Sequence, residues 1–126
     1  MFEKIIEIGL LFDFYGRLLN DRQYIAIELY YIHDLSLSEV GEHLEISRQG
    51  VHDILKRAEN SLYKYEEKLG LVKKFIDNKE KQKYILNYVE NIIQEAMNIN
   101  SEEILLNAKM IKEITLDIIE SGQEVK

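Results

Sequence analysis

The chain has 126 residues and a mass of 14.9 kDa, which is enough for one domain or for one domain with an extension. Hydrophobic residues make up 46% of the chain, which excludes a disordered protein, and the absence of proline favours long, uninterrupted helices. The absence of cysteine excludes disulfides and thiolate metal sites and fits a reducing cytoplasm. At a net charge of −7, we expect weak nonspecific affinity for nucleic acid unless the basic residues are segregated.

The first predicted element is a helix over residues 2–19 that is apolar on more than one face. A helix of this kind is usually buried on several sides, so we expect its side chains to form core rather than a ligand pocket. Part of its surface could instead pack against a second protomer. Its apolar residues include Ile5, Ile6, Leu10, Phe12, Phe14, Tyr15, Leu18 and Leu19.

A second helix is predicted over residues 21–33, with Asn20 as its natural N-cap. The spacing of Ile25, Leu29 and Ile32 predicts that these side chains face inward. Base-stacking platforms usually carry flanking cations, but Arg22 is the only basic residue of this helix. We therefore interpret its aromatic flank as the edge of a core; the flank consists of Tyr24, Tyr30 and Tyr31.

Residues 35–62 have the pattern of a helix-turn-helix. Ser36 and Glu39 form a capping-box sequence at the start of the first helix, and Ser47 is the natural N-cap of the second. Gly41 supplies a small residue where two helices joined by a tight turn must cross. The apolar residues follow helical spacing, with Leu37, Val40 and Leu44 in the first helix and Val51, Ile54, Leu55, Ala58 and Leu62 in the second.

The face of the second helix away from its apolar stripe carries candidate nucleic-acid-binding residues, namely Arg48, Gln49, His52, Lys56 and Arg57. In a DNA reader this face enters the major groove with its N-terminal residues first. Arg48 suits a guanine edge and Gln49 an adenine edge. Lys56 and Arg57 could bind phosphates.

Acidic residues on and beside this face argue against a strong DNA reader. Asp53 lies among the candidate residues and can pair with Arg57 one turn later. The preceding helix carries Glu39 and Glu42 but no lysine or arginine to hold a DNA backbone. Glu45 occupies the turn, where many such motifs have glycine.

Gly70 is a natural C-cap and the best candidate for a domain boundary. We therefore predict a helix-turn-helix domain over residues 1–70 and a helical extension over residues 71–126. Residues 73–83 hold five lysines and two acidic residues, which gives a net charge of +3. A segment of this kind is usually a solvated face, but it is also the most basic surface of this chain. Its candidate nucleic-acid-binding residues are Lys73, Lys74, Lys79, Lys81 and Lys83.

The extension reads as an antiparallel pair of amphipathic helices. Residues 98–100 interrupt the helical pattern, and Ser101 caps the second helix. These two helices could pack on each other, on the first domain or on another chain, with self-packing as the default. The first helix has apolar positions at Ile85, Tyr88, Val89, Ile92, Ile93 and Ala96, and the second at Ile104, Ala108, Ile111, Ile114, Thr115 and Ile118.

No pattern of catalytic or cofactor-binding residues is found. His33, His43 and His52 stand apart from one another, and there is no metal-ligand spacing, phosphate loop or nucleophile elbow. No stretch approaches the roughly 20 apolar residues of a membrane-spanning helix, and the first residues, MFEKIIEIG, do not resemble a signal peptide. We therefore expect a cytoplasmic binding protein that is not an enzyme and has no cofactor, metal or membrane partner.

Several separate motifs lie between Leu11 and Leu71, namely LFDFYGRLL, RQ at Arg22 and Gln23, LYY from Leu29 to Tyr31, DLSLSEV, ISRQGVHD, KRAE and YEEKLGL. Together they resemble the YlxM family, small bacterial proteins whose helix-turn-helix is similar to region 4 of sigma factors. The resemblance implies a cytoplasmic accessory protein of the signal recognition particle, the machinery that targets nascent membrane and secretory proteins. Its partners would be the GTPase of the particle, its RNA, or both. From Phe75 onward no resemblance is found.

Different functions fit these observations. The resemblance favours a regulatory or accessory protein of the signal recognition particle. The helix-turn-helix alone favours a transcriptional regulator that reads a DNA site, and the same fold could also serve only as a protein-interaction scaffold. The apolar excess in residues 2–19 and the apolar stripes of the C-terminal helices predict a homodimer.

Overall fold

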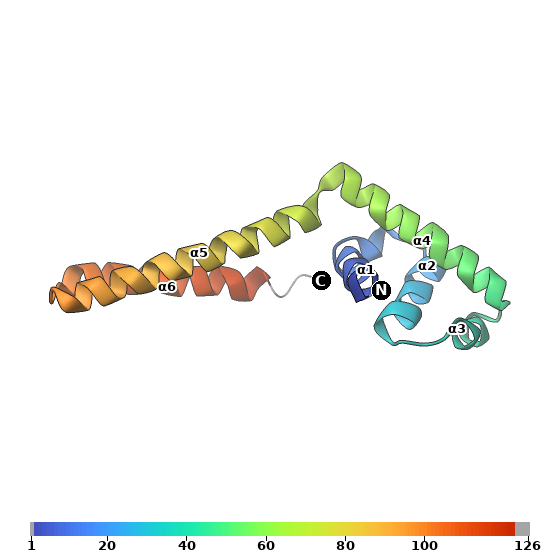
Figure 1. Ribbon diagram of the computed structural model, residues 1–126. Coiled ribbons are helices and arrows are strands. Elements are labelled where there is room, and N and C mark those ends of the chain that lie inside the picture. Colours follow the sequence, from blue (N-terminus) through green and yellow to red (C-terminus); the bar gives the residue numbers. More distant parts are fainter. Residues whose placement is uncertain (1, 123–126) are drawn as a thin grey trace. The chain divides into compact units, whose positions relative to one another are not determined.

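The computed structural model describes residues 2–122, so residue 1 and residues 123–126, at the outer ends of the two predicted domains, lie outside the described residues. Within the described range every regular element is helical and there is no strand (Figure 1). The predicted all-α fold is therefore confirmed. In chain order the elements are α1 (Phe2–Tyr15), the 3-10 turn η1 (Gly16–Leu18), α2 (Asp21–Ile27), the π-helical turn η2 (Glu28–Ile32), α3 (Leu37–Leu44), α4 (Arg48–Leu69), α5 (Leu71–Asn98) and α6 (Glu102–Gly122).

The predicted helix over residues 2–19 is shorter and less buried than expected. α1 ends at Tyr15, and the chain tightens into η1 because Gly16 lies directly against the ring of Phe12, where an added Cβ would be 2.9 Å from ring carbons. One face is buried through Ile8 and Leu11, whereas Ile5 and Ile6 are exposed. The prediction that this helix is buried on several sides is therefore wrong for its first two turns.

The second helix is interrupted where the sequence predicted a continuous element. α2 is regular from Asp21 to Ile27, and Asn20 caps it as predicted. The backbone then widens into η2, where the amide of His33 donates to the carbonyl of Glu28 at 3.0 Å, five residues earlier. The predicted inward residues Ile25 and Ile32 are exposed, and Ala26 and Ile27 are buried instead. The small side chain of Ala26 allows the backbone of α2 to approach α4, which periodicity alone does not reveal.

The helix-turn-helix has the caps that the sequence predicted. The amide of Glu39 donates to the hydroxyl of Ser36 at 3.1 Å, and the amide of Ser36 donates to the Glu39 carboxylate at 2.9 Å. The amide of Gly50 donates to the hydroxyl of Ser47 at 3.0 Å at the start of α4. Glu45 adopts the left-handed conformation, with φ of 57°, that ends α3. A non-glycine residue therefore makes a turn that usually favours glycine.

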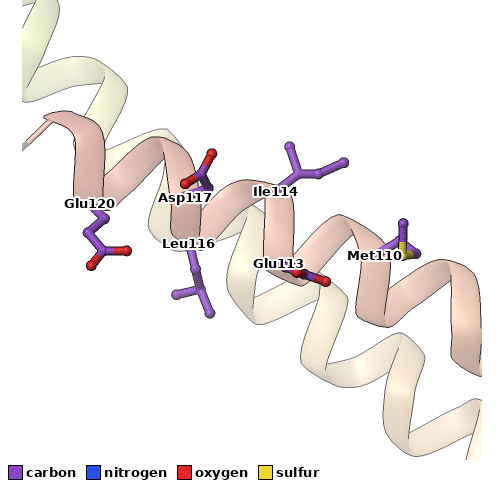
Figure 2. A pocket seen from close by; sticks show the side chains of 6 residues that line it. All are labelled: Met110, Glu113, Ile114, Leu116, Asp117 and Glu120. Carbon is purple, nitrogen blue, oxygen red and sulfur yellow. The ribbon is translucent and has the colours of Figure 1, made fainter.

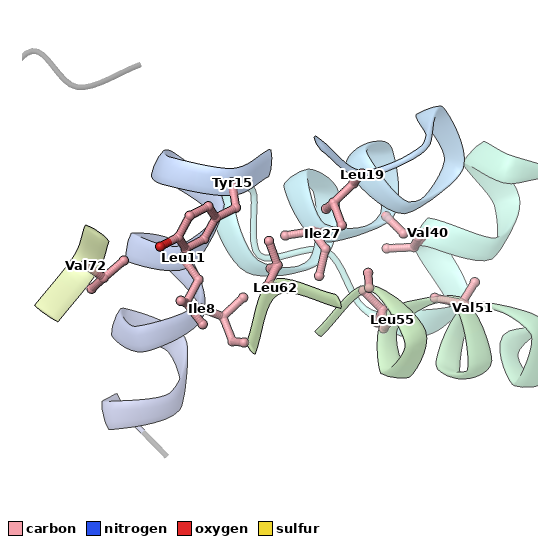
Figure 3. Packing of buried hydrophobic residues seen from close by; sticks show 12 residues of the cluster. Ile8, Leu11, Tyr15, Leu19, Ile27, Val40, Val51, Leu55, Leu62 and Val72 are labelled. Carbon is pink, nitrogen blue, oxygen red and sulfur yellow. The ribbon is translucent and has the colours of Figure 1, made fainter. Parts of the chain in front are cut away.

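The core of the first unit forms where α1, α2 and α3 meet the same face of α4. The predicted stripe of α4 is buried, apart from the half-buried Ile54. Figure 3 shows side chains of all four helices converging on this face. The buried core residues are Ile8, Leu11, Tyr15, Leu19, Ala26, Ile27, Val40, Val51, Leu55, Ala58, Leu62 and Val72.

The described residues form two compact units, the first ending at Val72 and the second beginning at Lys73. Gly70 ends α4 in the left-handed conformation, with φ of 62°, so the predicted C-cap is confirmed. Two side chains of the first unit then cap the start of α5. The amide of Leu71 donates to the Tyr15 hydroxyl at 3.1 Å, and the amide of Val72 donates to the Glu66 carboxylate at 3.0 Å.

The second unit is a hairpin of α5 and α6. Asn100 turns the chain with φ of 56°, and the hydroxyl of Ser101 accepts a hydrogen bond from the amide of Ile104 at 3.3 Å, as expected for a cap. Lys112 of α6 pairs with Glu90 of α5 at 2.5 Å. The isoleucines spaced by seven residues on α6 are exposed on the hairpin, so the default of self-packing does not hold for them, and packing on the first domain or on another chain stays a prediction; they are Ile104, Ile111 and Ile118.

The capping box of α3 leads to a prediction about pH. The backbone amide of Ser36 holds the pKa of the Glu39 carboxyl below its usual range, so this group contributes stability only when it is ionised. That contribution is fully present above the pKa of the unfolded chain, about 4.3, and is lost as the pH falls through the lower folded pKa. We expect Glu39→Gln to be less stable than the natural chain at neutral pH, and the difference to vanish once the pH falls below the lowered folded pKa of Glu39. Urea titrations of both proteins at several pH values measure the difference, and a constant difference would contradict the prediction.

Candidate nucleic-acid interface

Helix α4 displays the candidate residues of the helix-turn-helix on its solvent side. Arg48, Gln49, His52, Lys56 and Arg57 are all exposed. Val51, Leu55 and Ala58, which alternate with them, are buried, and this fixes the rotation of the helix about its axis. The structure therefore presents these five side chains to solvent on a helix that is held by the core of the first unit.

Asp53 binds one of the candidate residues of this exposed face, although not the one that the sequence suggested. The Asp53 carboxylate accepts a hydrogen bond from the side-chain amide of Gln49 at 3.2 Å, one turn earlier, and not from Arg57. The ring of His52 lies 3.8 Å from the same carboxylate oxygen. The adenine-matching amide is thus engaged within the helix, and a base would have to compete with Asp53 for it.

Arg22 belongs to this surface, although no functional role was predicted for it from the sequence. Its guanidinium donates to the carbonyl of Leu44 at 3.4 Å, which places it beside the turn between α3 and α4. Arg22 and Arg57 also line one hollow of about 450 Å³ between the start of α2 and α4. The hollow brings two cations together, but Asp21 lines it as well. No periodic pattern could have found this pair, because the two arginines lie on different helices, 35 positions apart.

The surface of α3 beside α4 is acidic, as the sequence indicated. Glu39, Glu42 and Glu45 are all exposed. The hydrogen bond from the Ser36 amide lowers the pKa of Glu39 and so keeps its charge in place near neutral pH. A phosphate backbone that approached α3 would meet like charges and no basic residue of that helix.

The second candidate set lies on the first turns of α5. Lys73, Lys74, Lys81 and Lys83 are exposed, and Lys79 is half-buried. The ammonium group of Lys79 lies 5.0 Å from the centre of the Phe75 ring, a cation–π contact that orients this side chain. Lys74, Lys81 and Lys83 extend from the exposed surface of the helix. Long, flexible ammonium side chains of this kind suit phosphates better than base edges.

The tyrosines of residues 24–31 are part of the core, as predicted from their lack of flanking cations. Tyr31 donates to the Glu59 carboxylate at 2.8 Å, and Lys4 pairs with the same carboxylate at 3.1 Å. Burial, followed by the hydrogen bond to Glu59, raises the pKa of Tyr31, and the bond to Glu59 raises the pKa of Lys4. Tyr24 packs on the ring of Phe12 at 4.8 Å. These rings are therefore engaged within the protein.

Residues 2–122 contain neither a cluster of metal ligands nor a membrane-spanning helix. No three or more histidine, aspartate or glutamate side chains in this range gather in a way that could hold a metal ion. None of the helices in the same range is long and apolar enough to cross a membrane.

The capped α3–turn–α4 unit and its exposed second helix define a helix-turn-helix protein. Residues 2–105 match the model of the family UPF0122, described as "Putative helix-turn-helix protein, YlxM / p13 like", and the chain belongs to this family. A UPF0122 protein of Acetivibrio thermocellus is 44% identical over 119 residues, which cover 94% of this chain and 99% of that protein. A relative from Thermoanaerobacter sp. is 48% identical over 116 residues, covering 79% of this chain and 99% of its own. A UPF0122 protein of Listeria welshimeri is 52% identical over 75 residues, covering 60% of this chain and 68% of its own. The resemblance inferred from the motifs is confirmed.

Proposed function

We propose that this protein is a cytoplasmic accessory protein of the signal recognition particle that binds the particle through the basic segment of α5, at its RNA or at its GTPase. The resemblance to the YlxM family is the reason for naming the signal recognition particle. We also propose that the first domain is similar to region 4 of sigma factors, that the protein has a regulatory role without chemistry of its own, and that it is a homodimer.

The division of the basic residues between two surfaces is the observation that carries the proposal. On α4 the groove-reading Gln49 is held by Asp53, and the neighbouring α3 is acidic. On α5 four exposed lysines follow one another within three turns, with Lys79 held over Phe75. Double-stranded RNA hides its base edges in a deep, narrow groove and is bound mainly through phosphates and 2′-hydroxyls. Lysines meet that requirement without a base-reading helix.

A transcriptional regulator is the second candidate, and one observation favours it. Arg22 and Arg57 line the same hollow at the edge of α4, where they could hold the phosphates of a duplex whose groove receives α4. In that case Arg48 and Gln49 would read the bases, and Gln49 would exchange its bond with Asp53 for one with adenine.

The two functions predict opposite results for two sets of substitutions. Changing all five lysines (Lys73, Lys74, Lys79, Lys81 and Lys83) to glutamine removes charge but keeps long side chains. We expect this variant to bind the purified RNA or GTPase of the particle at least about tenfold more weakly, because several phosphate or acidic contacts are lost. Arg48→Ala with Gln49→Ala should change the affinity by less than about twofold. Fluorescence anisotropy at one fixed salt concentration measures both variants.

Circular dichroism serves as the control for folding, since substitutions on exposed positions usually cost less than about 0.5 kcal/mol. The Arg48/Gln49 variant is also the matched control for the lysine variant, because both remove exposed polar groups from a helix. Loss of binding in the Arg48/Gln49 variant, with no change in the lysine variant, would refute binding through α5. If the natural chain binds neither the RNA nor the GTPase, the targeting role is refuted and the regulator takes its place.

A further inference from the structure

The contact line between α5 and α6 contains few buried apolar side chains in the described residues. Val89 and Ile93 of α5 meet Ala108 and Leu105 of α6, and this small cluster is the core of the hairpin in the described residues. Thr115 continues the buried line on α6. A two-helix hairpin with so little buried apolar surface has a weak basis for stability by itself.

The larger apolar side chains of the hairpin point away from this line. Ile85, Ile92, Ile104, Ile111 and Ile118 are between 38% and 51% exposed. On each helix they lie about 60–100° to the same rotational side of the buried line. Because α5 and α6 run antiparallel, an equal rotation brings both rows to one face of the hairpin. We call this the isoleucine face; Tyr88 and Ile114, 67% and 59% exposed, lie on its outer edges.

The isoleucine face is large enough for a stable interface. From the exposed fractions of its seven side chains, it offers on the order of 600 Å² of apolar surface per chain, at or above the largest patch on a typical monomer. Two such faces would bury about 1,200 Å² together, which reaches the range of specific protein–protein interfaces. The seven-residue spacing of the isoleucines is also the spacing that packs helices of two chains into one another.

We infer that the isoleucine face binds the same face of a second copy of this chain, so that two hairpins form an antiparallel four-helix bundle. Each hairpin then completes the core that it lacks alone, because the exposed isoleucines become the centre of the bundle. The inference rests on the homodimer proposed above and names the surface that forms it; it concerns only the second unit and does not depend on what the helix-turn-helix or the α5 lysines bind.

Light scattering on the full chain tests the inference with two matched variants. Ile111 and Leu116 are both 45% exposed on α6, but Leu116 lies on the other side of the helix from Ile114 (Figure 2). We expect the natural chain and Leu116→Glu to have twice the 14.9 kDa mass of one chain. Ile111→Glu should raise the dimer dissociation constant about a hundredfold or more, because two carboxylates would be buried in the bundle.

Cross-linking provides a second measurement that does not require a disruptive substitution. The chain has no cysteine, so single cysteines can be introduced at Tyr88, beside the isoleucine face, and at Asn87, which lies about 100° away on α5. We expect a bismaleimide to join two copies of Tyr88→Cys and not two copies of Asn87→Cys. A natural chain that stays monomeric at high concentration would overturn the inference. So would a dimer that Leu116→Glu dissociates and Ile111→Glu leaves intact.

Discussion

Replacing Leu62 with alanine is expected to lower the free energy of unfolding of the first unit by about 2–5 kcal/mol, the largest effect that we predict for a single substitution. Leu62 is completely buried on α4, where it packs in the core together with residues of α1 and α2 (Figure 3). Removing its branched side chain leaves a cavity that rigid neighbouring helices cannot fill. Urea denaturation followed by circular dichroism and tyrosine fluorescence measures the loss.

Leu69→Ala is the matched control for this substitution. Leu69 lies seven residues further along the same helix, on nearly the same side, but it is 54% exposed. We expect its replacement to cost less than about 1 kcal/mol, because little apolar surface is returned to water. Equal losses for the two variants would mean that α4 is not held by the core at Leu62 in the way the structure places it.

The parts of the fold that could be predicted from the sequence are those decided by local chemistry. Ser36, Ser47 and Gly70 are caps because their own side chains or backbone conformations provide for the unpaired backbone groups of helix ends that lie within a few residues. The buried stripe of α4 follows from its periodicity, because one continuous helix faces one core. The exposed side of α4 follows from the same rotation, which is why its candidate residues could be named.

The parts that could not be predicted depend on what other elements do. Ile25 has the spacing of a core residue, but α2 approaches α4 through Ala26, and η2 changes the rotation of the residues that follow. Ile104, Ile111 and Ile118 have an apolar period, but a period does not say which partner the stripe meets. Arg22 meets Arg57 only because α2 and α4 are neighbours in the fold. Each case requires tertiary contacts that a single helix does not encode.

The same substitution, glycine to alanine, is expected to have opposite effects at two helical positions of the first unit. Gly41 of α3 is buried, and a Cβ added there would lie 2.8 Å from the backbone carbonyl oxygen of Ile46. That oxygen belongs to the turn between α3 and α4, so the clash cannot be relieved by a side-chain rotation. Overpacking of this kind costs about 1–3 kcal/mol, and the gain in helix propensity, up to about 1 kcal/mol, offsets part of it. We expect Gly41→Ala to be destabilised by about 1–2 kcal/mol.

Gly9 of α1 provides the opposite case, because a Cβ added there would have no atom within 4 Å other than those of its chain neighbours and the backbone of its own helix. Gly9→Ala should therefore be stabilised by about 0.4–1 kcal/mol, mainly because the unfolded chain loses conformational freedom. Urea denaturation of both variants under one set of conditions measures the change in the free energy of unfolding for each. A shift of the α3–α4 turn should also move the start of α4, so the amide NMR signals of Arg48 and Gln49 should change in Gly41→Ala and not in Gly9→Ala. Stabilisation of both variants would show that the crossing of α3 and α4 has room for a methyl group, and that Gly41 is not required for the close approach of the two helices.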